Sequence, residues 1–223
     1  MLCSDALWNG QRTALGEIAD VSTLVLTGST IDEMVDEVLT SVTGPISLVG
    51  LSLGGIVAMA VAIAAPHRVE RLAVLSATAA GPRPGQRMGW ADFRERINTG
   101  MPVACAANEL WPSLVSAKNS DNRRLRNIVT DMAEQVGSVT FLRQLSAQQS
   151  RVDQHFELPT ILCPSLVLAA ANDALVPIVA MEKIANQISS AEFRILPGTG
   201  HLSPLESPAA IGTLLYNWIL RTL

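Results

Sequence analysis

An apolar run that ends in Gly-x-Ser-x-Gly constrains this chain more than any other feature of its sequence. The run begins at Pro45, and the pentapeptide spans Gly50 to Gly54 with Ser52 at its centre. This pattern predicts a strand that turns sharply into a helix, with the serine at the turn. We expect the turn to hold Ser52 in a strained backbone conformation that exposes its hydroxyl. Gly50 and Gly54 are expected to prevent clashes with the neighbouring strand and helix, because they have no Cβ, and Gly55 extends the same tolerance.

The helix expected after this turn, over residues 56–65, points its N-terminal amides at whatever Ser52 attacks. The N–H of Leu53 is then placed to stabilise an oxyanion. The pentapeptide alone also fits a small residue in a tight turn or a glycine-rich phosphate loop, although the GxGxxG spacing and a Walker lysine are both missing. A nucleophilic role for Ser52 therefore requires a base and an orienting acid elsewhere in the chain.

Candidates for the base and the acid each follow a strand-like segment. His201, one of three histidines, lies in a glycine-rich loop directly after the strand-like run 192–196. Asp173 follows the strand-like run 165–169. The chain order is therefore Ser52, Asp173, His201, which is one of the known orders of a nucleophile, an acid and a base in a hydrolytic triad.

Other ionisable residues have simpler interpretations. Asp153 is the alternative acid. His67 follows a proline at a predicted helix end, where it would interact with carbonyl groups, and His155 is expected at the surface. Glu206 lies beside Ser207-Pro208, a helix-start pattern, so we expect it to cap a helix.

These motifs together resemble the α/β-hydrolase superfamily, in particular its small bacterial esterase-like members. The resemblance rests on the segment Leu2–Trp8, the turn at Ser52, and residues 66–72, 132–144 and 200–206. It implies a mostly parallel, doubly wound α/β sheet with a helical cap over the active site. It also implies Ser52, Asp173 and His201 as the catalytic triad, and no motif calls for a metal or an organic cofactor.

Strand-like and helix-like segments alternate along much of the chain. Strands are predicted at residues 23–26, 46–49, 72–75, 165–169 and 192–196. This alternation implies right-handed crossovers and a parallel sheet covered on both faces. No convincing strand occurs between residues 81 and 158, where helices are predicted at 90–98, 106–114, 122–136 and 139–150. We therefore expect residues 1–80 and 159–223 to form the hydrolase core and residues 81–158 to form the helical cap.

The N-terminal region departs from the family pattern, which begins with further strands. The loop after the strand that precedes the Leu2–Trp8 segment normally supplies the second oxyanion amide, which here falls at Met1 or Leu2 and is assigned to Leu2. We expect the first strands to be missing. Three explanations compete: an internal methionine of a longer protein, direct pairing of the strands at 23–26 and 46–49, or cover from a partner chain. We favour the first explanation.

Composition limits the class of protein and its partners. A chain of 223 residues with 48% hydrophobic residues fits one α/β domain. A net charge of −4 gives no general attraction to nucleic acid. From the sequence we expect neither a secretory signal nor an apolar stretch that spans a membrane. Cys3, Cys105 and Cys163 have no metal-binding spacing and are expected to be reduced thiols in a cytoplasm, the last two as buried small hydrophobic residues.

The leading hypothesis is a cytoplasmic serine hydrolase that acts on a small-molecule carboxylic ester or lactone. Ser52 attacks the carbonyl group, His201 transfers the proton and Asp173 orients His201, while the N–H groups of Leu53 and Leu2 hold the oxyanion. Hydrolysis of a C–C bond and perhydrolysis use the same triad and stay open, as does a non-catalytic ligand-binding or scaffold homologue. A dehalogenase would need an aspartate in place of Ser52. A homodimer is compatible with each of these alternatives.

Overall fold

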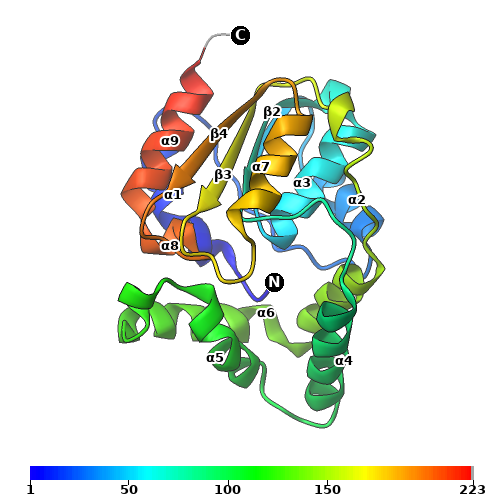
Figure 1. Ribbon diagram of the computed structural model, residues 1–223, viewed down its shortest axis with the longest axis vertical. Coiled ribbons are helices and arrows are strands. Elements are labelled where there is room, and N and C mark those ends of the chain that lie inside the picture. The colour runs from blue at the N-terminus through cyan, green and yellow to red at the C-terminus, as the bar shows by residue number, and fades with distance from the viewer. Residues whose placement is uncertain (222–223) are drawn as a thin grey trace.

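One parallel sheet of four strands organises the computed structural model, which describes residues 1–221 (Figure 1). The strand order in the sheet is β1-β2-β3-β4, and every neighbouring pair is parallel. The strands are β1 (Ile46–Leu51), β2 (Val69–Leu75), β3 (Ser165–Ala170) and β4 (Ala191–Leu196). The predicted α/β class with a parallel sheet is confirmed.

Helices surround this sheet and also form a separate layer at one end of it. Those associated with the sheet are α1 (Asn9–Leu15), α2 (Ile31–Ser41), α3 (Leu53–Ala64), α7 (Ile178–Gln187), α8 (Ser203–Glu206) and α9 (Pro208–Leu220). Between β2 and β3 the chain forms α4 (Pro84–Asn98), α5 (Val103–Leu114) and α6 (Arg123–Ser150), here called the cap helices. Short 3-10 helices occupy Asp5–Trp8, Pro66–Arg68, Ala117–Asn119 and Leu158–Thr160.

The sheet is buried on both faces, as the side chains of β2 show. Leu72 and Val74 belong to one buried cluster, together with residues of α2, α3 and α7. Ala73 and Leu75 belong to a second cluster, together with residues of α1, α9 and the cap helices. Successive side chains of a strand point to opposite faces, so a strand covered on both faces is apolar throughout.

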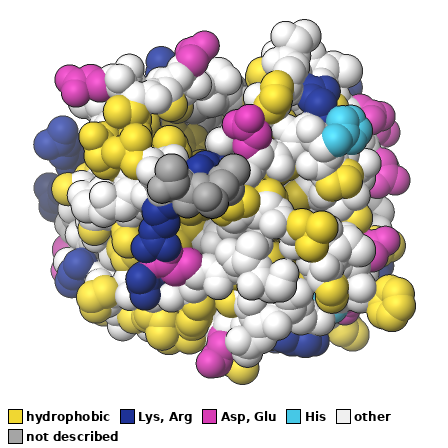
Figure 2. Space-filling view, turned by 90° about the horizontal axis from the view of Figure 1, so that it is seen from above, with side chains coloured by type: hydrophobic (Ala, Val, Ile, Leu, Met, Phe, Trp, Pro, Cys, Tyr) yellow, Lys and Arg dark blue, Asp and Glu magenta, His cyan; other side chains and the backbone are white. Residues whose placement is uncertain are grey.

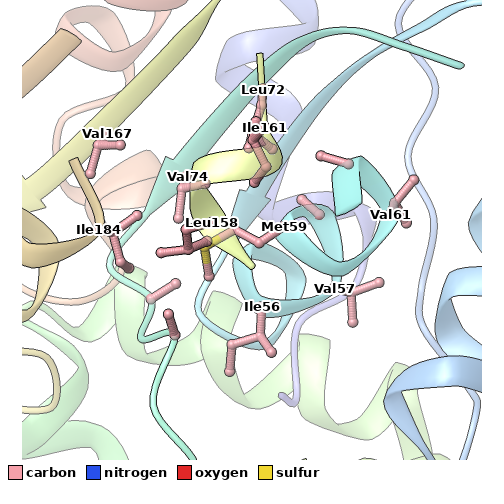
Figure 3. Packing of buried hydrophobic residues seen from close by; sticks show 14 of the residues in the cluster. Ile56, Val57, Met59, Val61, Leu72, Val74, Leu158, Ile161, Val167 and Ile184 are labelled. Atoms are coloured by element: carbon pink, nitrogen blue, oxygen red, sulfur yellow. The ribbon is translucent and has the colours of Figure 1, made fainter. Parts of the chain in front are cut away.

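The first of these clusters fills the space between the sheet and helices α3 and α7 (Figure 3). Met59 of α3 and Ile184 of α7 are fully buried and lie close to Val74 of the sheet. Leu158 and Ile161, from the segment that leads back from the cap helices, complete the packing. Complete burial of each such side chain contributes about 2 kcal/mol, so this layer fixes α3 firmly behind the end of β1.

Four of the five predicted strands are confirmed, and the strand predicted at residues 23–26 is wrong. Those residues form no strand, although Leu26 packs against the core while Leu24 remains 46% exposed. The reason is pairing: within residues 1–221 β1 is hydrogen-bonded to β2 alone, and no ladder joins it to residues 23–26. An extended apolar segment without a ladder partner does not become a strand.

The cap helices lie across the end of the sheet at which the strands terminate, and the N-terminal segment lies between the two (Figure 1). All helices predicted within residues 81–158 are present. α6 contains a break at Gly137, which has a φ of 73°. The predicted helices 122–136 and 139–150 are the two arms on either side of this break, since an L-residue rarely adopts that conformation and a glycine does so readily.

The opposite end of the molecule is an ordinary mixed surface. Figure 2 shows acidic and basic side chains interspersed with polar and hydrophobic atoms on this face. Among residues 1–221 no helix combines the length and apolarity that crossing a membrane requires. The prediction that Cys105 is buried is wrong: Cys105 is exposed, because Ala106, Ala107 and Trp111 form the buried face of α5.

Candidate active site

Ser52 occupies a strained turn between β1 and α3. Its φ of 54° and ψ of −115° are rarely adopted by a residue other than glycine. The Ser52 N–H donates to the carbonyl of Leu75 at 3.0 Å, and the Ser52 carbonyl accepts from Ile56 N–H at 3.0 Å. Strand β2 on one side and the first turn of α3 on the other therefore hold the strained conformation in place.

Two of the three glycines singled out around Ser52 are needed because another group approaches them closely. A Cβ at Gly50 would lie 2.2 Å from the carbonyl oxygen of Gly54, and a Cβ at Gly55 would lie 2.7 Å from the Cβ of Ala77. A Cβ at Gly54 would meet no atom within 4 Å. The expectation that Gly54 prevents a clash is therefore wrong. The backbone of Gly54 lies close to Gly50, but the space that a Cβ of Gly54 would occupy is open.

Asp173 and His201 form a buried pair. Asp173 Oδ2 lies 2.9 Å from His201 Nδ1, and the two side chains are 0% and 4% exposed. Asp173 Oδ1 accepts hydrogen bonds from the N–H groups of Leu175 (2.8 Å) and Val176 (3.0 Å). Both oxygens of this carboxylate are therefore occupied, and the ring of His201 is oriented through Nδ1.

The charge of Asp173 is stabilised where it lies. Burial opposes ionisation, because it raises the pKa of a carboxyl group. The hydrogen bond from His201 and those from the N–H groups of Val176 and Leu175 outweigh burial, so the pKa of Asp173 is lowered from its usual value. Asp173 is thus a carboxylate at neutral pH, and the proton between the two side chains resides on His201 Nδ1.

Backbone hydrogen bonds connect the loops that carry the pair. Asn172 N–H donates to the carbonyl of Thr199 at 2.9 Å, and Ala171 N–H donates to Leu196 at 2.9 Å. These bonds continue the pairing of β3 with β4 beyond the ends of both strands. Because the carboxyl ends of parallel strands meet at one edge, Ser52 after β1 lies at the same edge of the sheet as this pair.

The two predicted oxyanion donors have different surroundings. Leu53 is the first residue of α3, so its N–H has no acceptor within the helix. The N–H of Leu2, by contrast, donates to Gln144 Oε1 of α6 at 3.1 Å. Leu2 has a φ of 59° and its side chain is buried. Of these two N–H groups, only that of Leu53 has no acceptor within residues 1–221.

The alternative residues lie in other local structures. Asp153 accepts a hydrogen bond from the N–H of His155 at 2.8 Å, which makes a local turn. His155 Nδ1 lies 2.6 Å from Gln187 Oε1, and His67 is exposed in the 3-10 helix after α3. None of these three side chains contacts Asp173 or His201 through a hydrogen bond within residues 1–221.

Two residues near the site have roles that sequence reasoning did not assign. Gln144 is 3% exposed and bridges Leu2 to the carbonyl of Leu26. Its signal in the sequence is a polar residue on the same helical face as Phe141 and Leu145. Glu206 was expected to cap a helix, and that expectation is wrong: its carboxylate instead binds Gly200 in the loop of His201 and Ser116 and Asn119 in the distant connection between α5 and α6.

Metal ligands do not gather anywhere in the described part of the chain. No group of three or more His, Cys, Asp or Glu side chains is placed to hold a metal ion among residues 1–221. The side chains at the carboxyl edge of the sheet are a hydroxyl, an imidazole and a carboxylate. This set matches the chemical roles of nucleophile, base and orienting acid.

Comparisons with known proteins find hydrolases that resemble this chain in sequence and in fold. The chain is 25% identical to a thermophilic esterase from Thermogutta terrifontis, with a TM-score of 0.87 over 97% of this chain and 85% of that one. It is 27% identical over 179 residues to pyrrolizixenacetamide deacetylase of Xenorhabdus hominickii, which covers 79% of this chain and 66% of the relative. A Caulobacter sp. (strain K31) protein, provisionally named carbamate hydrolase RutD, is 26% identical over 77% of this chain and 64% of its own length.

The chain thus spans about two thirds of the length of these two curated relatives. A family model described as "Alpha/beta hydrolase family" matches residues 6–212. That range contains the turn at Ser52, all four strands, the cap helices and the loops of Asp173 and His201. The chain belongs to the alpha/beta hydrolase family.

Proposed function

We propose that this protein is a serine hydrolase that cleaves a small-molecule carboxylic ester or lactone through an acyl-enzyme. One observation carries the proposal: a strained serine follows β1, at the same edge of the sheet as a buried, hydrogen-bonded Asp173–His201 pair. A binding protein has no need for a buried carboxylate that orients a histidine behind such a turn. Similarity to the Thermogutta terrifontis esterase supports ester hydrolysis.

The proposed mechanism starts from the protonation state of His201. With the proton on Nδ1 toward Asp173, Nε2 has a free lone pair and acts as the general base. Nε2 takes the proton of Ser52 as the hydroxyl oxygen attacks the carbonyl carbon, and then delivers that proton to the leaving alcohol. Asp173 stabilises the imidazolium that forms between these two transfers. A water molecule, activated by His201, then hydrolyses the acyl group from Ser52.

The oxyanion of the tetrahedral intermediate requires hydrogen-bond donors. Leu53 N–H, at the start of α3, supplies one donor and the favourable end of the helix dipole. The N–H of Leu2 becomes a second donor only if it leaves Gln144. One oxyanion donor is worth about a hundredfold to a thousandfold in turnover. The rate therefore depends strongly on whether the N–H of Leu2 leaves Gln144 for the oxyanion.

Hydrolysis of a C–N acyl bond is the second candidate. The names of two relatives refer to a carbamate and to an acetamide derivative. The same triad cleaves either bond, and the difference is the leaving group, because an amine must be protonated before it departs and an alcohol departs more easily.

Active-site labelling combined with turnover tests the proposal. A fluorophosphonate probe should label Ser52, as located by mass spectrometry, and p-nitrophenyl acetate should be hydrolysed far faster than p-nitroacetanilide. Ser52→Ala should abolish both labelling and hydrolysis, with a melting temperature close to that of the parent. Faster cleavage of the anilide would favour the C–N reaction. Absence of labelling on Ser52 would support the non-catalytic alternative, and labelling without ester turnover would support C–C bond hydrolysis.

A further inference from the structure

The carboxylate of Glu206 connects the loop of His201 to the cap helices. Glu206 Oε1 accepts a hydrogen bond from Gly200 N–H at 2.6 Å. Glu206 Oε2 accepts from Ser116 N–H at 2.9 Å, from the Ser116 hydroxyl and from Asn119 Nδ2 at 2.8 Å. Ser116 and Asn119 lie in the connection between α5 and α6, so each oxygen of Glu206 binds a different part of the molecule.

All four of these neighbours are neutral donors. Within residues 1–221 Glu206 takes part in no ion pair with an arginine, lysine or histidine. A carboxylate accepts at both oxygens, whereas a glutamine has one oxygen and an NH₂ group that would face further donors. The site therefore requires a carboxylate because both of its oxygens accept hydrogen bonds. Pairing of its negative charge with a cation is not the reason.

Contacts on both sides of His201 tie it to the cap helices. On one side, a Cβ at Gly200 would lie 2.4 Å from Ser116 N, which shows how closely the two backbones approach. On the other side, Leu202 N–H donates to the carbonyl of Leu114, the last residue of α5, at 2.9 Å. Asp173 orients the ring of His201, but the backbone that carries this ring is held by Glu206 and α5.

We infer that Glu206 is a positioning residue of the triad. By holding Gly200 to the connection between α5 and α6, it sets the distance from His201 Nε2 to Ser52, so that the cap helices help to place the base. This inference rests on the proposed function. It predicts that loss of the Glu206 carboxylate slows proton transfer, because a base displaced by a fraction of an ångström catalyses poorly.

Glu206→Gln tests this inference at nearly constant side-chain volume. We expect kcat for p-nitrophenyl acetate to fall at least about tenfold, with KM changed much less, because protein donors occupy both oxygens of Glu206. Asn119→Ala removes one donor on the cap side and should give a smaller loss of kcat in the same direction. Glu182→Gln, an exposed change on α7, is the matched control and should leave kcat and KM unchanged.

A second measurement separates this inference from the proposed function. The chain has three histidines, so the ring resonances of His67, His155 and His201 can be assigned by NMR from single substitutions. Glu206→Gln should shift or broaden the ring signals of His201 and leave the other two in place, even if no ester is hydrolysed by the parent. Unchanged His201 signals would overturn the inference, and so would a lower melting temperature with unchanged kcat.

Discussion

The amide of Leu2 donates its hydrogen bond to the side chain of Gln144, 142 residues further along the chain. Gln144 in turn donates through Nε2 to the carbonyl of Leu26 at 2.9 Å. These partners fix the orientation of the side-chain amide, because an N–H can only donate and a carbonyl can only accept. One buried glutamine of α6 therefore provides hydrogen-bond partners for two backbone groups, the N–H of Leu2 and the carbonyl of Leu26. Both groups come before the first strand in the chain.

Replacement of Gln144 by leucine should destabilise the protein by about 2 kcal/mol, because it leaves the buried N–H of Leu2 and the part-buried carbonyl of Leu26 without their partner. Gln135→Leu, at an exposed position of the same helix, should change stability by less than about 0.5 kcal/mol. Urea denaturation of both variants measures the difference. Similar stabilities for the two would show that water replaces the Gln144 contacts at little cost.

Alanine substitutions should separate the two glycines that flank Ser52. Gly50→Ala places a Cβ 2.2 Å from a backbone oxygen and should cost about 1–3 kcal/mol or prevent folding. Gly54→Ala meets open space at the start of α3 and should raise stability by up to about 1 kcal/mol, because alanine favours helix. Thermal unfolding of both variants tests this contrast, and a destabilised Gly54→Ala protein would contradict it.

Asp173→Asn should lower turnover by about a thousandfold or more, because asparagine can hold His201 in the wrong tautomer. It should also change how stability depends on pH. The folded pKa of Asp173 is lowered, so its contribution to stability is complete above the unfolded pKa of about 4 and disappears as pH falls through the folded pKa.

The difference in unfolding free energy between the parent and Asp173→Asn should therefore be larger at pH 7 than at about pH 3. Chemical denaturation of both proteins at each pH provides the measurement. A difference that does not depend on pH would show that the carboxylate gains nothing from its hydrogen bonds. If Asp153→Asn impairs turnover more than Asp173→Asn, the acid is misassigned.

The amides of β1 should exchange hydrogen faster than those of the neighbouring strand, because β1 lies at the edge of the sheet. Within residues 1–221 β1 has one ladder neighbour, whereas β2 and β3 each have two. Alternate amides of an edge strand point away from its neighbour, so peptides from residues 46–51 should exchange faster than those from residues 69–75. Mass spectrometry resolves these peptides. Equal protection of both would mean that a further segment or a second copy covers the edge of β1.

Much of the fold could be predicted from local sequence patterns. The apolar runs of β1 to β4 and the glycine at position 137, between the two arms of α6, are local features, and each formed where the sequence indicated. Ser52, Asp173 and His201 each follow a predicted strand, and this position places them at one edge because parallel strands end on the same side. Here the sequence alone determined the sheet and the main residues of the candidate site.

Contacts between distant segments were decided only by the tertiary structure. Residues 23–26 have an apolar pattern typical of a strand, yet they lack a ladder partner and stay irregular. Glu206 lies in a helix-start pattern, but its carboxylate binds Ser116, 90 residues away. A sequence does not show which donor pairs with which acceptor, because the packing of helices and loops around the core decides the pairs.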